Sequence, residues 1–123
     1  MGPSPTPTLT AAPARELDCK LNWQSPGDWY KVRPLREFST GWKVTNTGTS
    51  TWDSESVEFT YLEGAKLHEE ATVRLPSSVP PGSSVILSVG MRAPRNPSIY
   101  TTYWSLRQES IFFCRVALTI RVE

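Results

Sequence analysis

The sequence has little of what an enzyme or a membrane-spanning protein needs. Its 123 residues include one histidine, His68, and seven glycines that stand singly, so it has no glycine-rich phosphate loop. No apolar run comes near the ~18 residues of a membrane span. The N-terminus has neither the basic nor the apolar region of a secretory signal. We therefore expect no phosphate-loop chemistry and no membrane insertion of this segment.

An excess of charge of either sign is also lacking. The 13 Lys and Arg residues nearly balance the 12 Asp and Glu residues, which leaves a formal net charge of +1. A chain without a strong net field is not steered onto polyanions. We expect no nucleic-acid partner, and the composition leaves the oligomeric state open.

Convergent catalytic groups are absent as well. We interpret His68, Glu69 and Glu70 as a solvated surface turn, because a metal site would need further ligands at suitable spacing. The serines have no histidine in a frame that would supply a base, and strand alternation brings no two carboxylates face to face. The sequence thus predicts no enzyme, no metal and no cofactor.

The residues that are present favour β-strands. Five Trp, four Tyr and four Phe supply apolar bulk, while 11 prolines mark turns. Apolar and polar side chains alternate in stretches that include 17–23, 57–61, 85–91 and 112–122. Such alternation is typical of a strand with one buried face, and about seven strands separated by turn signals predict an all-β, two-sheet antiparallel sandwich.

The chain divides into two segments by composition. Residues 1–14, MGPSPTPTLTAAPA, carry no charge and contain four prolines. Such a segment cannot bury enough apolar surface to offset its ordering entropy. We predict a disordered Pro/Thr/Ala-rich tether over 1–14 and one folded domain over 15–123.

Both cysteines fall on the predicted core faces of their strands. Cys19 alternates in phase with Leu21 and Trp23, and Cys114 with Phe112 and Val116. A bond between them would close a loop of about 95 residues and stabilise the fold by roughly 4–5 kcal/mol in the chain-entropy model. The alternative is two buried free thiols. We favour the bond, which is consistent with an extracellular or cell-envelope location and attachment through the tether.

One stretch is far more specific than the rest. Residues 38–52 read FSTGWKVTNTGTSTW, and Val79-Pro80-Pro81-Gly82, Ala93-Pro94 and Trp104-Ser105-Leu106 follow. This set resembles the four-tryptophan immunoglobulin-like domain found in cargo receptors of selective autophagy and in bacterial envelope proteins. The resemblance implies an immunoglobulin-like sandwich without catalytic activity, used for protein recognition or as a spacer. A stand-alone tethered copy looks more like the envelope proteins.

The resemblance is incomplete at its C-terminal end. Three signature tryptophans fall at Trp42, Trp52 and Trp104, and the fourth, expected near Ala117, is missing. Because the neighbours of Trp42 and Trp104 in strand phase are apolar, we assign both to the structural core. Trp52 follows a polar loop, and we expect it to cap one end of that core.

A contact surface is predicted in the segment 26–36. Trp29, Tyr30 and Arg33 lie there beside Lys31 and Arg36, and exposed aromatic and arginine side chains often anchor interfaces. The alternative is an aromatic hairpin tip folded onto the sandwich. An unidentified protein is the favoured partner, and a glycan stacked on the exposed aromatics near Trp29 and Tyr30 is the second hypothesis.

Overall fold

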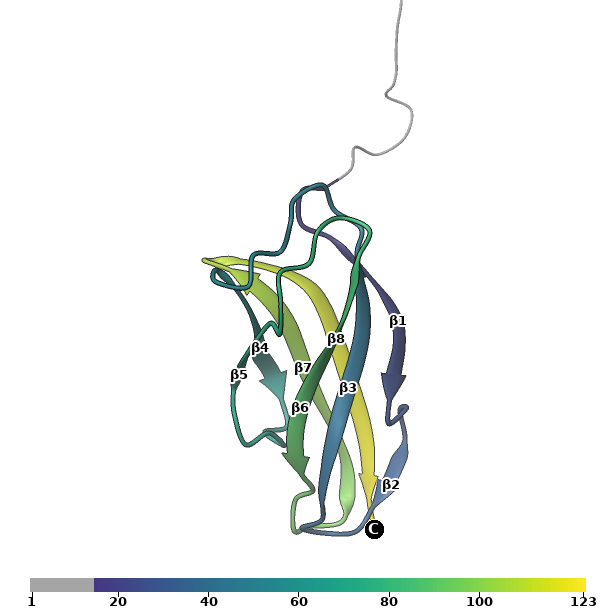
Figure 1. Cartoon of the computed structure of the whole chain (residues 1–123). Helices are drawn as coiled ribbons and strands as arrows, with labels where there is room; N and C mark the ends of the chain where they lie inside the picture. Colours follow the sequence, from purple (N-terminus) through teal and green to yellow (C-terminus); the bar gives the residue numbers. More distant parts are fainter. Residues whose placement is uncertain (1–14) are drawn as a thin grey trace, which may run out of the picture.

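The computed structural model describes residues 15–123, and in this part of the chain all regular structure is β-strand. Eight strands form two sheets packed face to face as a sandwich (Figure 1). The strands are β1 (Cys19–Ser25), β2 (Tyr30–Val32), β3 (Glu37–Asn46), β4 (Val57–Gly64), β5 (Thr72–Arg74), β6 (Ser84–Arg92), β7 (Ser98–Gln108) and β8 (Ile111–Val122). The predicted immunoglobulin-like two-sheet fold is confirmed, and the predicted tether lies outside the described residues.

The two sheets differ in size and in strand direction. One sheet has three strands in the order β1-β3-β6, and the other has five in the order β2-β8-β7-β4-β5. Every pairing is antiparallel except that of β2 with β8, which is parallel. The short β2 strand is the element that the alternation pattern did not predict. It places the segment around Trp29 beside the last strand of the domain.

The core follows the alternation in the sequence. On β6, Val85, Leu87, Val89 and Met91 are buried and the residues between them are exposed. Trp42, Trp52 and Trp104 are each 0% exposed. Phe59 lies between two of these rings, edge-on to Trp42 at 5.5 Å and stacked on Trp104 at 5.2 Å between centroids. Aromatic pairs of this geometry add to the burial energy of the rings.

Trp52 lies deeper than the capping position expected for it. Its backbone exchanges two hydrogen bonds of 2.9 Å with Val79, and its ring packs against Phe113 at 5.7 Å. The bridge to Val79 draws the loop that follows β3 under the Pro-Pro-Gly turn at 80–82, so the indole enters the interior.

The predicted disulfide is present. Cys19 on β1 is bonded to Cys114 on β8, with their Cα atoms 5.4 Å apart. These strands belong to different sheets, so the bond links the two layers of the sandwich. Strand phase therefore located both cysteines correctly.

Strand phase was wrong about the burial of Leu21, Trp23 and Phe112. Leu21 lies on the edge strand β1 and is 44% exposed. A register shift between Leu21 and Trp23 places Trp23 opposite Lys43 on the outer face of its sheet, where it is 43% exposed. A second shift, where β7 pairs with the start of β8, leaves Phe112 51% exposed and turns Phe113 toward the core. An extra residue in one strand moves every side chain beyond it to the other face.

Candidate partner-binding surface

The turn before β2 is fixed by three hydrogen bonds, two to β8 and one to β1. The backbone N–H of Trp29 donates to the carbonyl of Thr119 at 2.8 Å. One oxygen of Asp28 accepts the N–H of Thr119 at 3.0 Å and the side-chain amide of Gln24 at 3.2 Å. Because these bonds join β1, the turn and β8, the position of Trp29 is set by the framework of the sandwich rather than by the turn alone.

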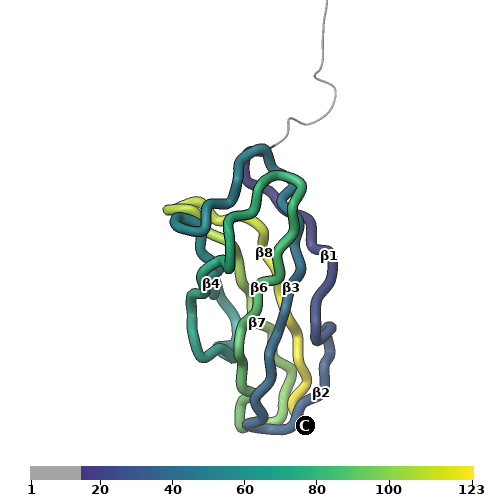
Figure 2. The backbone as a smooth tube through the Cα atoms, in the orientation of Figure 1, coloured from purple at the N-terminus to yellow at the C-terminus, as the bar shows by residue number. Residues whose placement is uncertain are grey.

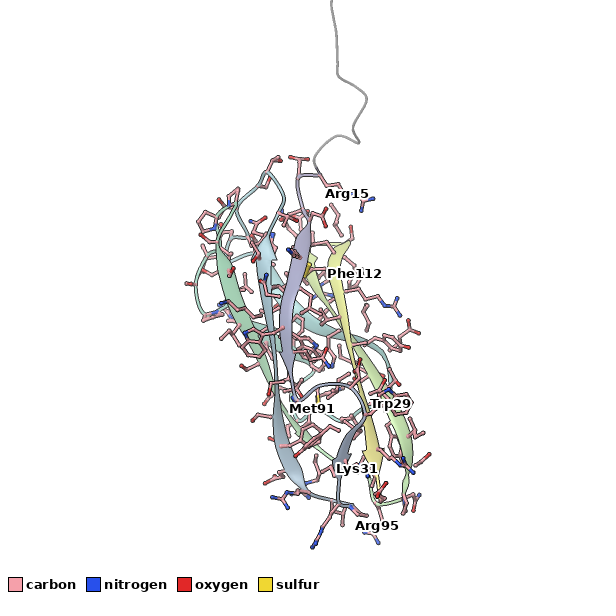
Figure 3. The ribbon with its side chains drawn as sticks, turned by 90° about the vertical axis from the view of Figure 1, so that its right-hand side faces the viewer. Arg15, Trp29, Lys31, Met91, Arg95 and Phe112 are labelled. Atoms are coloured by element: carbon pink, nitrogen blue, oxygen red, sulfur yellow. A yellow bond between two sulfur atoms is a disulfide. The ribbon has the colours of Figure 1, made fainter. Side chains whose placement is uncertain are left out.

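The predicted aromatic pair is divided between the outside and the inside. The side chain of Trp29 is 60% exposed, and its φ angle is 69°. Tyr30 is half-buried against the core, with its ring 5.7 Å from that of Phe38. The two rings therefore form no shared flat platform, and Trp29 remains as the exposed aromatic of this segment. Figure 3 shows Trp29 beside β8.

The turn after β2 presents a second bulky residue in an unusual backbone conformation. In Arg33-Pro34-Leu35-Arg36 the N–H of Arg36 donates to the carbonyl of Arg33 at 3.2 Å, and Leu35 has a φ of 66°. Proline in the second position and a positive φ in the third are features of a type II turn, where glycine is the usual third residue. Arg33 itself is exposed. Leu35, which sequence reasoning missed, is 47% exposed.

This turn is held against the loop that follows β6. The N–H of Leu35 donates to the carbonyl of Ala93 at 3.0 Å, and the N–H of Ala93 donates to the carbonyl of Arg36 at 2.9 Å. The two loops thus form one connected surface at the end of the sandwich. Sequence reasoning missed Leu35 because no local pattern shows that a distant loop fixes its conformation. The available signal was an apolar residue between two arginines directly after a proline.

A shallow hollow of about 440 Å³ lies beside Leu35. Its wall continues into the segment before β5 and into the end of β6, and its lining residues are Leu35, Lys66, Leu67, His68, Glu69, Arg92, Ala93 and Pro94. The hollow is open to solvent and joins apolar with charged groups. Such a surface suits a side chain of a partner better than an enclosed small molecule.

Positive charge is concentrated at the same end of the molecule. Figure 3 shows Lys31 and Arg95 at one end of the sandwich, while Arg15 and Phe112 lie at the other. Within residues 15–123 the ion pairs use Arg92, Arg107, Arg115 and Arg121. The cations of this end that take part in none of them are Lys31, Arg33, Arg36, Lys66 and Arg95.

His68 is not part of a solvated turn, and that interpretation was wrong. Its ring packs 4.6 Å from the ring of Tyr61 and 5.3 Å, edge-on, from Trp104. Its Nδ1 atom is buried without a hydrogen-bond partner among the described residues. Burial first, and then the positive charge of Lys66, lower the pKa of His68 from its ordinary value of 6.5.

Residues 15–123 contain neither a candidate metal site nor a candidate membrane-spanning helix. Among residues 15–123, no three His, Cys, Asp or Glu side chains are grouped so that they would hold a metal ion. Over the same residues, the structure contains no helix that is long and apolar enough to cross a membrane.

Comparison with known proteins places the chain among immunoglobulin-like domains. The family model described as "Ig-like domain from next to BRCA1 gene" matches residues 25–122. No curated protein matches the chain.

Two solved structures are similar to the chain at low sequence identity. One is the ASH / PapD-like domain 7 of human CEP192, with 11% identity over 96% of this chain and 91% of that one, at a TM-score of 0.44. The other is a family 123 glycoside hydrolase from Clostridium perfringens, whose title concerns glycolipid glycan hydrolysis. It has 13% identity over 79% of this chain and 22% of that one, at a TM-score of 0.33.

Proposed function

This chain belongs to the family of immunoglobulin-like domains whose model spans residues 25–122, and from that premise we propose a finer function. It is a non-catalytic protein-interaction module of the four-tryptophan type, carried by a secreted or cell-envelope protein. Residues 1–14 act as its tether, and residues 26–36 contact the partner.

The packing of the tryptophans supports binding through the surface. Trp42, Trp52 and Trp104 are fully buried with Phe59 in one continuous core. Side chains fill the space between the sheets, as in other small sandwiches. A partner therefore meets the loops and the outer sheet faces.

The disulfide supports an oxidising compartment. Bonds of this kind persist in secreted and cell-envelope proteins and are rare where cellular thiols keep cysteines reduced. Cys19 and Cys114 are the two cysteines of the chain, and they are bonded to each other. The uncharged, proline-containing composition of 1–14 fits an extended tether between such a domain and its attachment point.

The observation that carries the proposed contact is the conformation of Trp29. A bulky residue with positive φ is energetically unfavourable, and exposing an indole to water adds to that cost. Residues held in this way are concentrated at functional sites. Hydrogen bonds to β8 keep Trp29 in place before any partner arrives, so binding does not have to order it.

Photo-cross-linking at position 29 tests the proposed function. A benzophenone amino acid replaces Trp29 in the cells that produce the protein, and the matched control carries it at Ile86, which is exposed on the outer face of the other sheet. We expect discrete protein adducts from position 29 and none from position 86. Equal labelling at both positions, or none at 29, would contradict the proposal.

A glycan array distinguishes the second hypothesis. One exposed indole offers less stacking surface than the two-ring platform first expected, so we expect no glycan to bind wild type more than it binds Trp29→Ser. A glycan that binds wild type but binds Trp29→Ser more weakly would show that the partner is a carbohydrate and not a protein.

A further inference from the structure

We propose that a surface centred on Leu35, which shares Lys31, Arg33 and Arg36 with the proposed contact segment 26–36, binds an acidic peptide segment of a partner protein, with Leu35 as its apolar anchor. We call this surface the basic end and define it as Lys31, Arg33, Leu35, Arg36, Lys66 and Arg95 with the hollow beside Leu35. The inference rests on the proposed function as a protein-interaction module, but it concerns other residues than Trp29.

The first argument is that the basic end holds Leu35 in a conformation that a leucine avoids. Its Cβ atom makes a φ of 66° unfavourable, and glycine or asparagine would fit the third position of this turn without that cost. Nearly half of the side chain is nevertheless exposed. A leucine chosen for stability would be buried or would sit elsewhere in the turn, so its position favours contact with a partner.

The second argument is that the anchor is already positioned. Three backbone hydrogen bonds fix the turn: one closes it from Arg36 to Arg33, and two join it to Ala93. Ala93 is buried in the core at the end of β6. Leu35 and the rim of the hollow therefore move together with the sandwich, and a partner gains its contacts without first ordering a loop.

The third argument is charge. Two carboxylates near this end are already engaged, Glu37 by Arg92 at 3.1 Å and Glu123 by Arg121 at 2.8 Å. Glu69 lines the hollow and the exposed Glu70 follows it in the chain, and neither takes part in an ion pair among residues 15–123. These two carboxylates stand against the five cations of the basic end that enter no ion pair either. A partner that brings several carboxylates complements this surface.

The shape of the surface favours a peptide over a lipid bilayer. A bilayer surface takes up a projecting apolar face, whereas Leu35 lines a concave hollow with polar groups on its rim. An extended acidic segment with one apolar side chain would place that side chain against Leu35 in the hollow. Its carboxylates would then lie over Arg33, Arg36 and Lys66.

Selection from a phage-displayed library of random dodecapeptides tests the proposal. Enriched peptides should carry a net negative charge and an apolar residue. Their affinity for Leu35→Gly should fall at least tenfold, because glycine keeps the turn and removes the anchor. Arg33→Glu together with Arg36→Glu should also weaken binding, and added salt should weaken it further.

Ile86→Ser is the matched control, since Ile86 has the same exposed fraction as Leu35, 47%, but lies on the outer face of the three-stranded sheet. It should bind the peptides as wild type does. Equal denaturation midpoints of the variants show that each is folded, so a loss of binding reports on the surface.

Each remaining result overturns the proposal in a different way. Enrichment of neutral or basic peptides, failure to enrich any, or equal affinity for Leu35→Gly excludes an acidic segment at Leu35. Peptides that lose affinity in Trp29→Ser but not in Leu35→Gly support the proposed contact at Trp29 and exclude Leu35 as the anchor. Binding to phosphatidylglycerol vesicles that requires Leu35 assigns the basic end to a membrane. Self-association in sedimentation that requires Leu35 assigns it to a second copy.

Discussion

At the scale of single residues, two of the four non-glycine residues with positive φ among residues 15–123 are exposed apolar side chains of one segment, while the other two are Glu109 in a turn and Cys114 in the disulfide. Trp29 and Leu35 have φ angles of 69° and 66°, and both flank the short strand β2. The left-handed conformation costs an L-residue about 1–2 kcal/mol, so the two together cost a sizeable part of a stability that is typically about 5–15 kcal/mol. Neither side chain offsets this conformational cost by being fully buried. Their presence in one segment is best explained by contact with another molecule.

His68 gives the domain a dependence on pH. Its neutral ring packs between Tyr61 and Trp104, and burial with the nearby Lys66 lowers its folded-state pKa below the unfolded value of 6.5. The unfolded chain therefore binds a proton more readily than the folded domain as the pH falls. Stability should be at its full value above pH 6.5. It should decline from there until the pH passes the lowered folded-state pKa.

Urea denaturation from pH 7.5 to 4.5 measures this effect, with His68→Gln as the reference. Below pH 6.5 the unfolding free energy of wild type should fall relative to that of His68→Gln. Carboxylates titrate in both proteins and cancel in that difference. A difference that is constant across the range would show that His68 has the same pKa folded and unfolded.

At the scale of elements, the loop between β3 and β4 depends on one buried side chain. Asn46 is 0% exposed, and its amide donates to the carbonyls of Ser50 at 2.9 Å and Val79 at 2.8 Å. Its side-chain oxygen accepts the N–H of Gly48 at 2.9 Å. The asparagine of the sequence signature thus satisfies loop backbone groups, as its place at a strand end suggested.

Asn46→Ala should destabilise the domain by about 2–4 kcal/mol, since three buried hydrogen bonds contribute roughly 0.5–1.5 kcal/mol each and their partners would be left unsatisfied. Asn22→Ala is the control, because the exposed Asn22 accepts one bond from Thr45. It should change stability by less than ~0.5 kcal/mol. Chemical denaturation of both variants measures the two effects, and equal costs would mean that the loop has other supports.

The strands were predictable where alternation runs unbroken and unpredictable where it is interrupted. On β6 each apolar residue of the pattern is buried. The burial of Trp23 and Phe112 was predicted wrongly because a register shift lies beside each of them. A bulge has no signature in the local alternation of polar and apolar residues. Leu35 was missed for a related reason. Its conformation is fixed by hydrogen bonds to Ala93, a partner far along the chain that local turn chemistry does not reveal.

At the scale of the whole molecule, the two ends of the sandwich differ in charge. In Figure 2 the described chain begins at the upper end, and the C-terminus lies at the lower end. The upper end includes segments 15–18, 46–56 and 108–111, which contain five carboxylates and one cation: Glu16, Asp18, Asp53, Glu55 and Glu109, with Arg15. The basic end lies opposite. A tether that leaves from the upper end would therefore present the basic end away from its attachment point.

The disulfide is the covalent link between the two layers, and its contribution to stability is the last prediction. The bond between Cys19 and Cys114 spans a sequence separation of 95 residues, so it strongly restricts the unfolded chain. Cys19→Ala with Cys114→Ala should lower the free energy of unfolding by about 4–5 kcal/mol in the chain-entropy model. A domain at the low end of the usual range of stability, about 5 kcal/mol, would then be largely unfolded, whereas one of about 15 kcal/mol would stay folded. Tryptophan fluorescence in urea measures the change, because three indoles leave a fully buried core on unfolding.

Reducing agent should destabilise wild type to a similar degree and leave the double variant unchanged, since that variant has no thiol. Equal urea midpoints for wild type and the double variant would show that packing alone joins the sheets, and they would remove the main support for an oxidising compartment.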